Sequence, residues 1–421
     1  MRKDKIAIIG LGYVGLPLAV EFGKKFPVLG FDINQSRIEQ LQSGHDSTLE
    51  VSDEELKDSP QLSFSSTVAD LEDCNVYIVT VPTPIDAHKQ PDLTPLIKAS
   101  EMLGKVIKHN DIIIYESTVY PGVTEQICVK ILEECSGLQF NVDFFCGYSP
   151  ERINPGDMTH RLPDIRKVVA GSTPEVTDIL ETLYQEIIEA GVYRAESIRV
   201  AEAAKVIENT QRDLNIALVN ELAMIFNKIG LDTESVLKAA ETKWNFISFR
   251  PGLVGGHCIG VDPYYLAYLA RSVGIAPRMI NVGREINDSM SSYIFSKLTD
   301  RLASFSIALN KASVLFLGVT FKENCPDIRN SRVFDILDKL LSKNSKITIY
   351  DPVAPTLPKK YEELRIDFID FDDRYDAILI CVSHDVFKMI KPNKLAELVI
   401  SKSLIFDLKA SYREEIGFFR L

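Results

Sequence analysis

The chain has 421 residues, more than one hydrophobic core usually supports, so two or three domains are expected. Acidic residues outnumber basic ones by 59 to 47, and the formal charge of −12 argues against general binding to nucleic acid or to an anionic membrane. The seven cysteines are scattered and odd in number, without a Cys-x-x-Cys pair, which argues against a disulfide framework and favours a reducing cytoplasm.

The first 32 residues carry the signals of a dinucleotide-binding turn. An apolar strand at 5–9 runs into Gly10-Leu-Gly12-Tyr13-Val14-Gly15 and then into an apolar helix that reaches about Phe22. A second strand at 27–31 ends at Asp32, where a carboxylate can bond ribose hydroxyls. The sequence therefore predicts NAD binding. Asp32 disfavours the 2′-phosphate of NADP, although Arg37 nearby leaves that cofactor open.

Further buried strands of a parallel sheet are predicted at 75–81, 111–116 and 143–148. Each strand is followed by small or polar residues, among them Thr83, Thr118 and Glu151. Ligands of open α/β sheets bind beyond the carboxyl ends of the strands, so these three side chains are expected to face one crevice.

Residues 197–230 form the longest predicted helix, which ends at a C-cap glycine. Its length suits a helix that joins two domains and buries an apolar face in a second subunit, so a homodimer or higher homo-oligomer is expected. Lys205 and Asn209 are four residues apart and therefore share one helix face. From spacing alone they can equally be two solvated polar residues.

The loop at 252–265 is rich in glycine and contains Cys258, with Asp262 four residues further on. Glycines let the backbone approach a ligand closely, which makes Cys258 a candidate nucleophile. A free cysteine is, however, more often a small buried apolar residue. His257 is expected to be structural, because adjacent residues seldom point at one another, and the six histidines lack metal-ligand spacing, so no metal is predicted.

Alternation of strands and helices resumes after a helix that ends near Ser304. Strands are predicted at 313–318, 346–350, 377–382 and 403–407, with a helix from about Ser331. This second sheet lacks the glycine fingerprint and is expected to bind something other than NAD. Lys322 and Arg329 follow its first strand, where they can contact phosphate or be ordinary surface cations.

The predicted fold is α/β, with two Rossmann-like, doubly wound parallel-sheet domains joined by a long central helix and a helical middle domain. The expected boundaries are 1–196 for the NAD-binding domain, 197–304 for the helical dimerisation domain with the cysteine loop, and 305–421 for the second sheet domain. Three glycines and a proline interrupt the apolar run at 6–20, so neither a signal peptide nor a membrane span is predicted.

Seven motifs occur in order along nearly the whole chain: GLGYVGLP at 10–17, VPTP at 81–84, ESTV at 116–119, SPER at 149–152, AKVIEN at 204–209, GGHCIGVD at 255–262 and FKENCPDIRNS at 321–331. With them the chain resembles the UDP-glucose/GDP-mannose dehydrogenase family. The cysteine motif and the sequence Ser-Pro-Glu-Arg-Ile-Asn-Pro-Gly are most similar to the branch of the family that acts on N-acetylhexosamines.

The resemblance implies an enzyme that oxidises the C6 hydroxymethyl group of a UDP-N-acetylhexosamine, first of all UDP-N-acetylglucosamine, to a carboxylate for capsule, O-antigen or other surface polysaccharide. Two NAD are reduced per turnover. After the first hydride transfer Cys258 attacks the aldehyde to form a thiohemiacetal, and after the second a thioester remains for water to hydrolyse. UDP-N-acetylgalactosamine and UDP-N-acetylmannosamine stay open as substrates, UDP-glucose ranks below them, and the non-enzymatic alternative is a silent nucleotide-sugar-binding regulator.

The resemblance also implies roles for residues. Lys205 and Asn209 stabilise the alkoxide and tetrahedral oxygens, Asp262 and Thr118 position or activate water, and Glu151 assists hydrolysis of the thioester to Cys258. The expected cofactor contacts are Gly10, Gly12, Tyr13, Val14, Gly15, Asp32, Arg37, Thr83 and Thr118. The expected substrate contacts are Glu151, Arg152, Lys205, Asn209, Arg250, Gly255, Lys322 and Arg329. Pro155 stands where glucose-specific members have a second glutamate, so the base for hydrolysis stays open.

Overall fold

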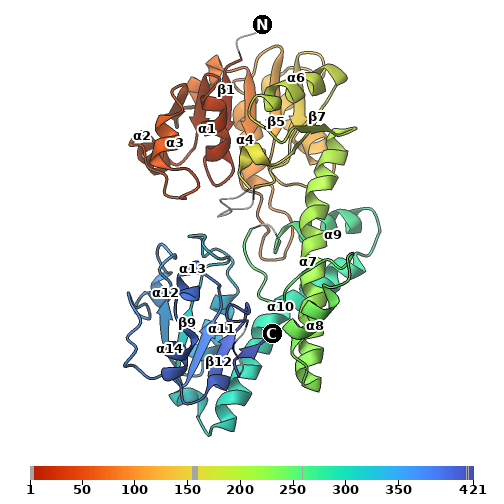
Figure 1. Ribbon diagram of the computed structural model, residues 1–421. Coiled ribbons are helices and arrows are strands. Elements are labelled where there is room, and N and C mark those ends of the chain that lie inside the picture. The colour runs from red at the N-terminus through yellow and green to blue at the C-terminus, as the bar shows by residue number, and fades with distance from the viewer. Residues whose placement is uncertain (1–3, 154–159, 258, 414, 416) are drawn as a thin grey trace. The chain divides into compact units, whose positions relative to one another are not determined.

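The computed structural model describes residues 4–153, 160–257, 259–413, 415 and 417–421 (Figure 1). The predicted nucleophile Cys258 and the departure at Pro155 lie outside these residues. The chain divides into two compact units, one of Met1–Glu208 with Tyr264–Ile275 and one of Asn209–Pro263 with Ala276–Leu421. Each unit contains one parallel-type sheet, and the predicted α/β class with two Rossmann-like sheets is confirmed.

Within the described residues, the sheet of the first unit has eight strands in the order β3-β2-β1-β4-β5-β6-β7-β8. The strands are β1 (Ile6–Ile9), β2 (Val28–Phe31), β3 (Leu62–Ser65), β4 (Val76–Val79), β5 (Asp111–Tyr115), β6 (Phe144–Tyr148), β7 (Lys167–Gly171) and β8 (Val192–Arg194). Sequence analysis missed β3, β7 and β8. The pairing of β6 with β7 is antiparallel, so β7 begins at the edge of the sheet where the parallel strands end.

Helices cover the first sheet on both faces (Figure 1). Its helices are α1 (Gly15–Gly23), α2 (Gln35–Gln42), α3 (Asp53–Lys57), α4 (Thr94–Leu103), α5 (Val129–Ser136) and α6 (Pro174–Gln185). Helices α1 and α6 share one face, since the rings of Phe22 and Tyr184 lie 5.7 Å apart in an edge-on contact. Alternate strand residues such as Ile6, Ile8 and Ile78 point into the same core, as the two-residue period of a strand requires.

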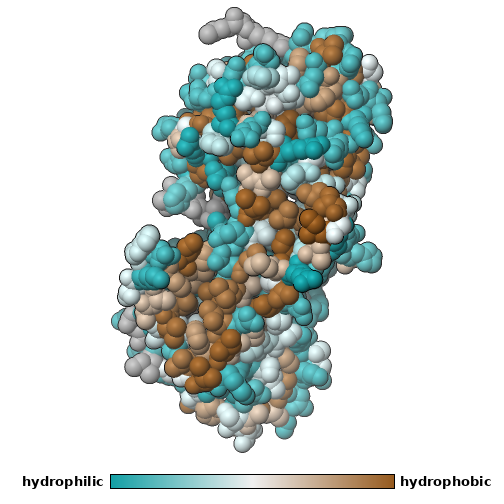
Figure 2. Space-filling model, turned by 90° about the vertical axis from the view of Figure 1, so that its right-hand side faces the viewer, coloured by the Kyte–Doolittle hydropathy of each residue, from teal (hydrophilic) through white to brown (hydrophobic). Residues whose placement is uncertain are grey.

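The predicted long helix is α7 (Ile198–Ile229), and α8 (Thr233–Ala240) follows it. Several large apolar side chains of α7 are exposed, among them Leu218, Ile225 and Ile229, which recur after seven and four residues and so form one stripe. Figure 2 turns the side of the molecule that carries α7 toward the viewer and shows apolar side chains gathered there. No helix within the described residues is long and apolar enough to cross a bilayer.

The second unit contains a parallel sheet in the order β10-β9-β11-β12-β13. Its strands are β9 (Ser313–Leu317), β10 (Lys346–Tyr350), β11 (Ala377–Ile380), β12 (Ile405–Asp407) and β13 (Phe419–Arg420). Helix α9 (Asp262–Ser272) lies mostly in the first unit. The helices that follow it, all in the second unit, are α10 (Arg278–Ser304), α11 (Val333–Leu341), α12 (Lys359–Glu362), α13 (Asp385–Lys388) and α14 (Pro392–Glu397). Helix α10 buries Ile294 and Leu298 against the same core as Phe316 of β9, which anchors the long helix to the sheet.

Candidate active site

The glycine turn after β1 is shaped by close packing at one glycine and by open space at another. A Cβ atom at Gly15 would lie 1.8 Å from the carbonyl oxygen of Gly10 and 2.4 Å from Oγ1 of Thr80, so only glycine fits. A Cβ atom at Gly12 would meet nothing within 4 Å. The backbone at Gly12 is therefore accessible to a ligand, at the N-terminal end of α1 where phosphate is favoured.

Asp32 ties the glycine turn to the end of β2. Its Oδ2 accepts the N–H of Leu11 at 2.9 Å, and its Oδ1 accepts the N–H of Asn34 at 2.9 Å. These bonds fix the carboxylate at the edge of the turn, and each oxygen keeps a lone pair for a ribose hydroxyl.

Arg37 is buried and committed to the fold. Its Nε donates to the carbonyl of Leu11 at 3.0 Å, Nη1 donates to Ser47 at 3.1 Å, and Nη2 pairs with Asp46 at 2.7 Å. Burial opposes ionisation of Asp46, but the N–H and hydroxyl of Thr48 and the Arg37 charge together lower the pKa of that carboxyl. Because the guanidinium is buried and all three of its nitrogens are bonded within the fold, it is a poor partner for a 2′-phosphate, which favours NAD over NADP.

Thr83, Thr118 and Glu151 lie beyond the ends of β4, β5 and β6, which are adjacent and parallel. The side chains thus follow three neighbouring strands at one edge, the arrangement that the sequence predicts. The hydroxyl of Ser117 donates to the carbonyl of Val81 at 2.6 Å and links two of these strand ends.

Glu151 is buried and its carboxylate is held by the first unit itself. Its Oε1 accepts the N–H groups of Arg152 and Ile153, and its Oε2 accepts Lys167 Nζ at 3.0 Å. Arg152, a predicted substrate contact, pairs with Glu208 of α7 at 2.7 Å. Lys167, the first residue of β7, also contacts this predicted site. Sequence analysis missed it, because a lysine at the start of a short apolar run usually indicates a surface position.

Lys205 and Asn209 are both buried on α7, one helical turn apart. Asn209 Nδ2 donates to Oδ2 of Asp262, the first residue of α9, at 2.5 Å. Two predicted catalytic residues that are 53 positions apart in sequence are therefore in direct contact. Their burial removes the alternative that Lys205 and Asn209 are solvated residues on an exposed helix face.

The loop before Asp262 is held by a buried amide clamp. Asn220 of α7 accepts the N–H of Gly252 at 2.8 Å and donates to its carbonyl at 3.1 Å. The same amide donates to Asn287 of α10 at 2.8 Å. Because one side chain bonds both the N–H and the carbonyl of Gly252, Asn220 fixes where the glycine-rich loop begins.

The glycines of this loop are also required by packing within the second unit. A Cβ atom at Gly255 would lie 2.5 Å from the carbonyl oxygen of Asn330, and one at Gly256, which has a φ of 80°, would lie 2.6 Å from the Phe321 ring. Nε2 of His257 is 3.5 Å from Oδ2 of Asp327, which agrees with a structural role for this histidine. Segment 321–332 thus packs directly against the glycine-rich loop.

Two predicted phosphate contacts of the second unit, Arg329 and Arg250, are paired with carboxylates. Arg329 follows β9 and binds Asp327 at 2.7 Å, yet its side chain is 55% exposed and can still reach a ligand. Lys322 lies in the same segment and is half-buried. Arg250 bonds Glu234 at 2.7 Å and Glu241 at 2.5 Å.

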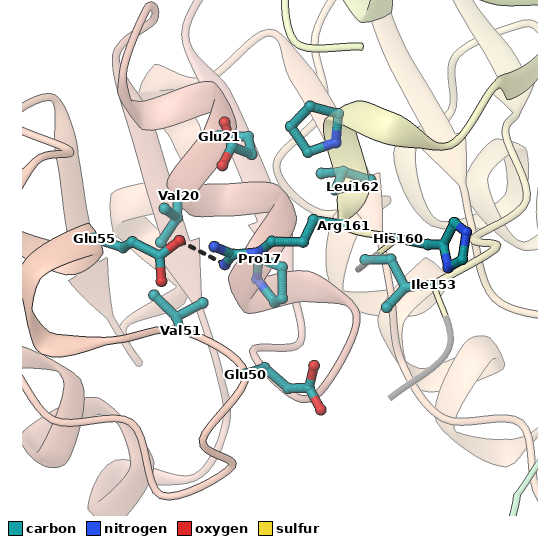
Figure 3. Close-up of a pocket in the computed structure, with 11 residues that line it drawn as sticks. Pro17, Val20, Glu21, Glu50, Val51, Glu55, Ile153, His160, Arg161 and Leu162 are labelled. Carbon is teal, nitrogen blue, oxygen red and sulfur yellow. Dashed lines mark ion pairs between the residues drawn. The ribbon is translucent and has the colours of Figure 1, made fainter. Parts of the chain in front are cut away.

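Figure 3 shows a pocket of the first unit. None of the described side chains that line it is a predicted catalytic residue. Pro17 of α1, Glu50 and His160 line this pocket, and Arg161 closes one side through a 2.5 Å ion pair with Glu55. It lies beside α1, whereas the predicted catalytic residues Thr118 and Glu151 follow strand ends.

Comparison with known proteins matches three successive parts of the chain to three domains of one protein family. Residues 4–188, 199–289 and 315–414 match the models of the NAD binding, central and UDP binding domains of the UDP-glucose/GDP-mannose dehydrogenase family. The chain is 56% identical over 423 residues to the UDP-N-acetyl-D-glucosamine 6-dehydrogenase of Pseudomonas aeruginosa, with 100% of both chains covered. It is 54% identical to the Salmonella typhi protein of the same name, with 96% of each chain covered.

The fold agrees with solved structures of similar proteins. A UDP-D-ManNAc dehydrogenase from Pyrococcus horikoshii matches 99% of this chain and 98% of its own, with a TM-score of 0.88 and 30% sequence identity. The match extends over nearly the full length of both chains, so it includes the NAD-binding, central and UDP-binding regions together.

Proposed function

Because the chain belongs to the UDP-glucose/GDP-mannose dehydrogenase family, an NAD-dependent oxidoreductase family, we propose that it oxidises C6 of UDP-N-acetylglucosamine to the carboxylate. The observation that carries the choice of sugar is the 56% identity over the whole length of a relative named for this substrate. UDP-N-acetylmannosamine is the second candidate, because the Pyrococcus structure is named for it at 30% identity. The acid product suits synthesis of a surface polysaccharide.

The residues of the first unit fit NAD. Open space at Gly12 admits a pyrophosphate to the backbone, and Asp32 offers carboxylate oxygens to ribose hydroxyls. When bound, NAD supplies the acceptor for the hydride that leaves the sugar carbon. Thr83 and Thr118 follow strands at the same edge of the sheet and are proposed to contact the cofactor.

Lys205, Asn209 and Asp262 are proposed to handle the oxygen of the reacting carbon. The Lys205 ammonium and the Asn209 amide are donors on one buried helix face, which suits an alkoxide or a tetrahedral oxygen. Asp262 holds the Asn209 amide at 2.5 Å and so fixes its direction. In this scheme Cys258 attacks the aldehyde, its thiol proton passes to a base, and the thioester left after the second hydride loss is cleaved by water.

Glu151, Arg152, Arg250, Gly255, Lys322 and Arg329 complete the proposed substrate contacts. Glu151 assists hydrolysis, with Thr118 helping to position water, and the cations of the second unit face the nucleotide phosphates. Exposure of the Arg329 guanidinium supports this part of the proposal, because a ligand can reach it without breaking the fold.

The test is the yield of NADH per sugar consumed, measured by absorbance across a panel of UDP-sugars. We expect two NADH per UDP-N-acetylglucosamine and the highest kcat/KM for this sugar. Cys258→Ser should stop or stall after the first oxidation. One NADH per sugar with release of aldehyde from the native enzyme, or full four-electron turnover by Cys258→Ser, would contradict the covalent scheme.

We further propose that the cytoplasmic enzyme is a homodimer or higher homo-oligomer built on the apolar stripe of α7. Leu218, Ile225 and Ile229 are each about half exposed or more, which is a large apolar area for a free helix. Ile225→Glu should reduce the mass measured by light scattering to that of one chain. Ile179→Glu, at a similarly exposed apolar position on α6, is the control, and an unchanged mass for Ile225→Glu rules out this interface.

A further inference from the structure

In the interior of the first unit, one lysine contacts two buried glutamates, one of which is the predicted catalytic carboxylate Glu151. Lys167 Nζ lies 2.7 Å from Glu116 Oε2 and 3.0 Å from Glu151 Oε2. The side chains are 2%, 0% and 7% exposed for Lys167, Glu116 and Glu151. Tyr184 of α6 donates its hydroxyl to the second oxygen of Glu116.

The topology of the sheet explains how these groups meet. Glu116 follows β5 and Glu151 follows β6, two parallel strands that end at the same edge. Strand β7 runs antiparallel to β6, so its first residue, Lys167, reaches that edge from the opposite direction. A fully parallel sheet would place the first residue of its strand at the far edge.

The cluster holds the Glu151 carboxylate from both sides. One oxygen accepts two backbone N–H groups and the other accepts the Lys167 ammonium. The neighbouring cation, Arg152, is turned away to Glu208 and to the carbonyl of Arg166. Lys167 is therefore the cation in contact with Glu151, and it holds the carboxylate together with the two backbone N–H groups.

Two carboxylates share this one ammonium. Burial, together with the Glu151 charge, raises the pKa of Glu116 to about 7, against the opposing effects of Lys167 and Tyr184. Burial opposes ionisation of Lys167, but the two glutamates outweigh it and raise the pKa of the ammonium, which stays charged. Burying three ionisable groups is costly, and an apolar replacement of similar volume is often as stable, so the cluster invites a reason other than stability.

We propose that Lys167 and Glu116 are positioning residues for hydrolysis of the acyl-enzyme: Lys167 holds Glu151 in one orientation, and Glu116 sets how much of the ammonium charge Glu151 receives. This inference rests on the proposed function, in which Glu151 assists cleavage of the Cys258 thioester. It assigns a task to two residues outside the motif-based set of catalytic residues.

The proposal predicts a direction for the effect of pH. Below about pH 7 Glu116 is protonated, so Lys167 pairs with the Glu151 carboxylate alone and occupies its Oε2. Above this pH Glu116 is ionised and competes for the ammonium, so Lys167 holds the Glu151 carboxylate less tightly and its Oε2 can accept a hydrogen bond from the attacking water. The charged or titratable groups that face Glu116 are Lys167 from β7, Glu151 after β6 and Tyr184 from α6. Hydrolysis should therefore accelerate as pH rises through about 7.

The experiment separates oxidation from hydrolysis in the full-length enzyme. Stopped-flow absorbance measures the NADH burst, intact-protein mass detects the acyl adduct, and decay of that adduct is followed from pH 5.5 to pH 9. In Lys167→Met we expect a burst of two NADH per site, an accumulated adduct and a decay at least about tenfold slower. In Glu116→Gln we expect the decay rate to lose its rise near pH 7. Tyr184→Phe removes a bond that favours ionised Glu116, so the rise should move to higher pH.

Glu125→Gln is the matched control, because Glu125 pairs with Arg199 at the surface and should keep the native pH profile. A folded Lys167→Met enzyme with native adduct decay, or a Glu116→Gln enzyme that keeps the rise near pH 7, overturns the inference. If Lys167→Met does not fold, Glu116→Gln decides, since it leaves the Lys167–Glu151 pair in place.

Glu151→Gln distinguishes failure of the proposed function from failure of the positioning role. Native turnover in Glu151→Gln contradicts the role of Glu151 in the proposed function and, with it, the positioning role of Lys167. An accumulated adduct in Glu151→Gln, together with a native profile in Glu116→Gln, refutes the positioning role alone.

Discussion

The same substitution at two glycines of one turn should impair folding at one position and cofactor binding at the other. In Gly15→Ala the new methyl group would lie 1.8 Å from the Gly10 carbonyl oxygen, roughly 1.5 Å inside ordinary contact, and that oxygen belongs to the backbone of the turn. Relief requires a shift of β1 or of α1. We expect a loss at the upper end of the about 1–3 kcal/mol typical of overpacking, or about 6–12 °C in the melting temperature of the first unit.

Gly12→Ala meets no atom within 4 Å and should fold as the native chain does. Its methyl group occupies the space through which a pyrophosphate would reach the backbone, so the Kd for NAD should rise at least about tenfold, or roughly 1.4 kcal/mol. Scanning calorimetry and NADH fluorescence titration measure the two effects. A native melting temperature in Gly15→Ala would refute the packing argument, and a native Kd in a folded Gly12→Ala would refute the placement of the cofactor.

Three further outcomes follow from buried polar contacts. Asn220→Ala leaves the N–H and carbonyl of Gly252 without their shared partner and should lower the free energy of unfolding by about 3 kcal/mol. Asn215→Ala on the same helix should cost under about 1 kcal/mol, and equal urea midpoints for the two variants would contradict the clamp. Glu116 keeps its proton in the folded state up to about pH 7 but releases it near pH 4.5 when the chain is unfolded, so native stability falls as pH rises between these values. In urea titrations over this interval, Glu116→Gln should gain about 3 kcal/mol in the free energy of unfolding relative to the native enzyme. Asp46 has a lowered pKa, so its pairing with Arg37 stabilises the fold above about pH 4 and is lost on acidification. The difference in free energy of unfolding between the native enzyme and Asp46→Asn should therefore vanish at low pH, and a difference that stays constant with pH would show that the charge is unimportant.

Local patterns in the sequence predict most of the secondary structure, because the signals are local. Strands such as β1 and β9 are short apolar runs that end at turn residues, and α7 is an uninterrupted helical stretch that begins and ends within one residue of the prediction. Strand β7 was missed although Val168 and Val169 are buried, because a lysine and two short apolar residues also fit a loop. Its antiparallel pairing depends on Gly147 opposite Gly171, a contact between distant residues that no local pattern encodes.

The predicted site shows the same division between residue type and arrangement. Motifs predict roles for Glu151, Asn209 and Asp262, and the structure brings Asn209 to Asp262 at 2.5 Å. They do not reveal that Glu151 shares an ammonium with Glu116, since the partners stand 51 and 16 positions from Lys167 in sequence. A charged residue reads as exposed until the groups that neutralise it are known, and those groups are fixed by topology.

The glycine-rich loop shows how a correct residue type can carry an incomplete reason. Sequence analysis explains its glycines by the approach of a substrate, but Gly255 and Gly256 are already required by contact with Asn330 and Phe321. A side chain at either position would push the loop away from segment 321–332, which also carries Lys322. The packing that fixes the backbone before Cys258 and the cations proposed for the nucleotide phosphates are therefore properties of the same segment, so a change that loosens one should also displace the other.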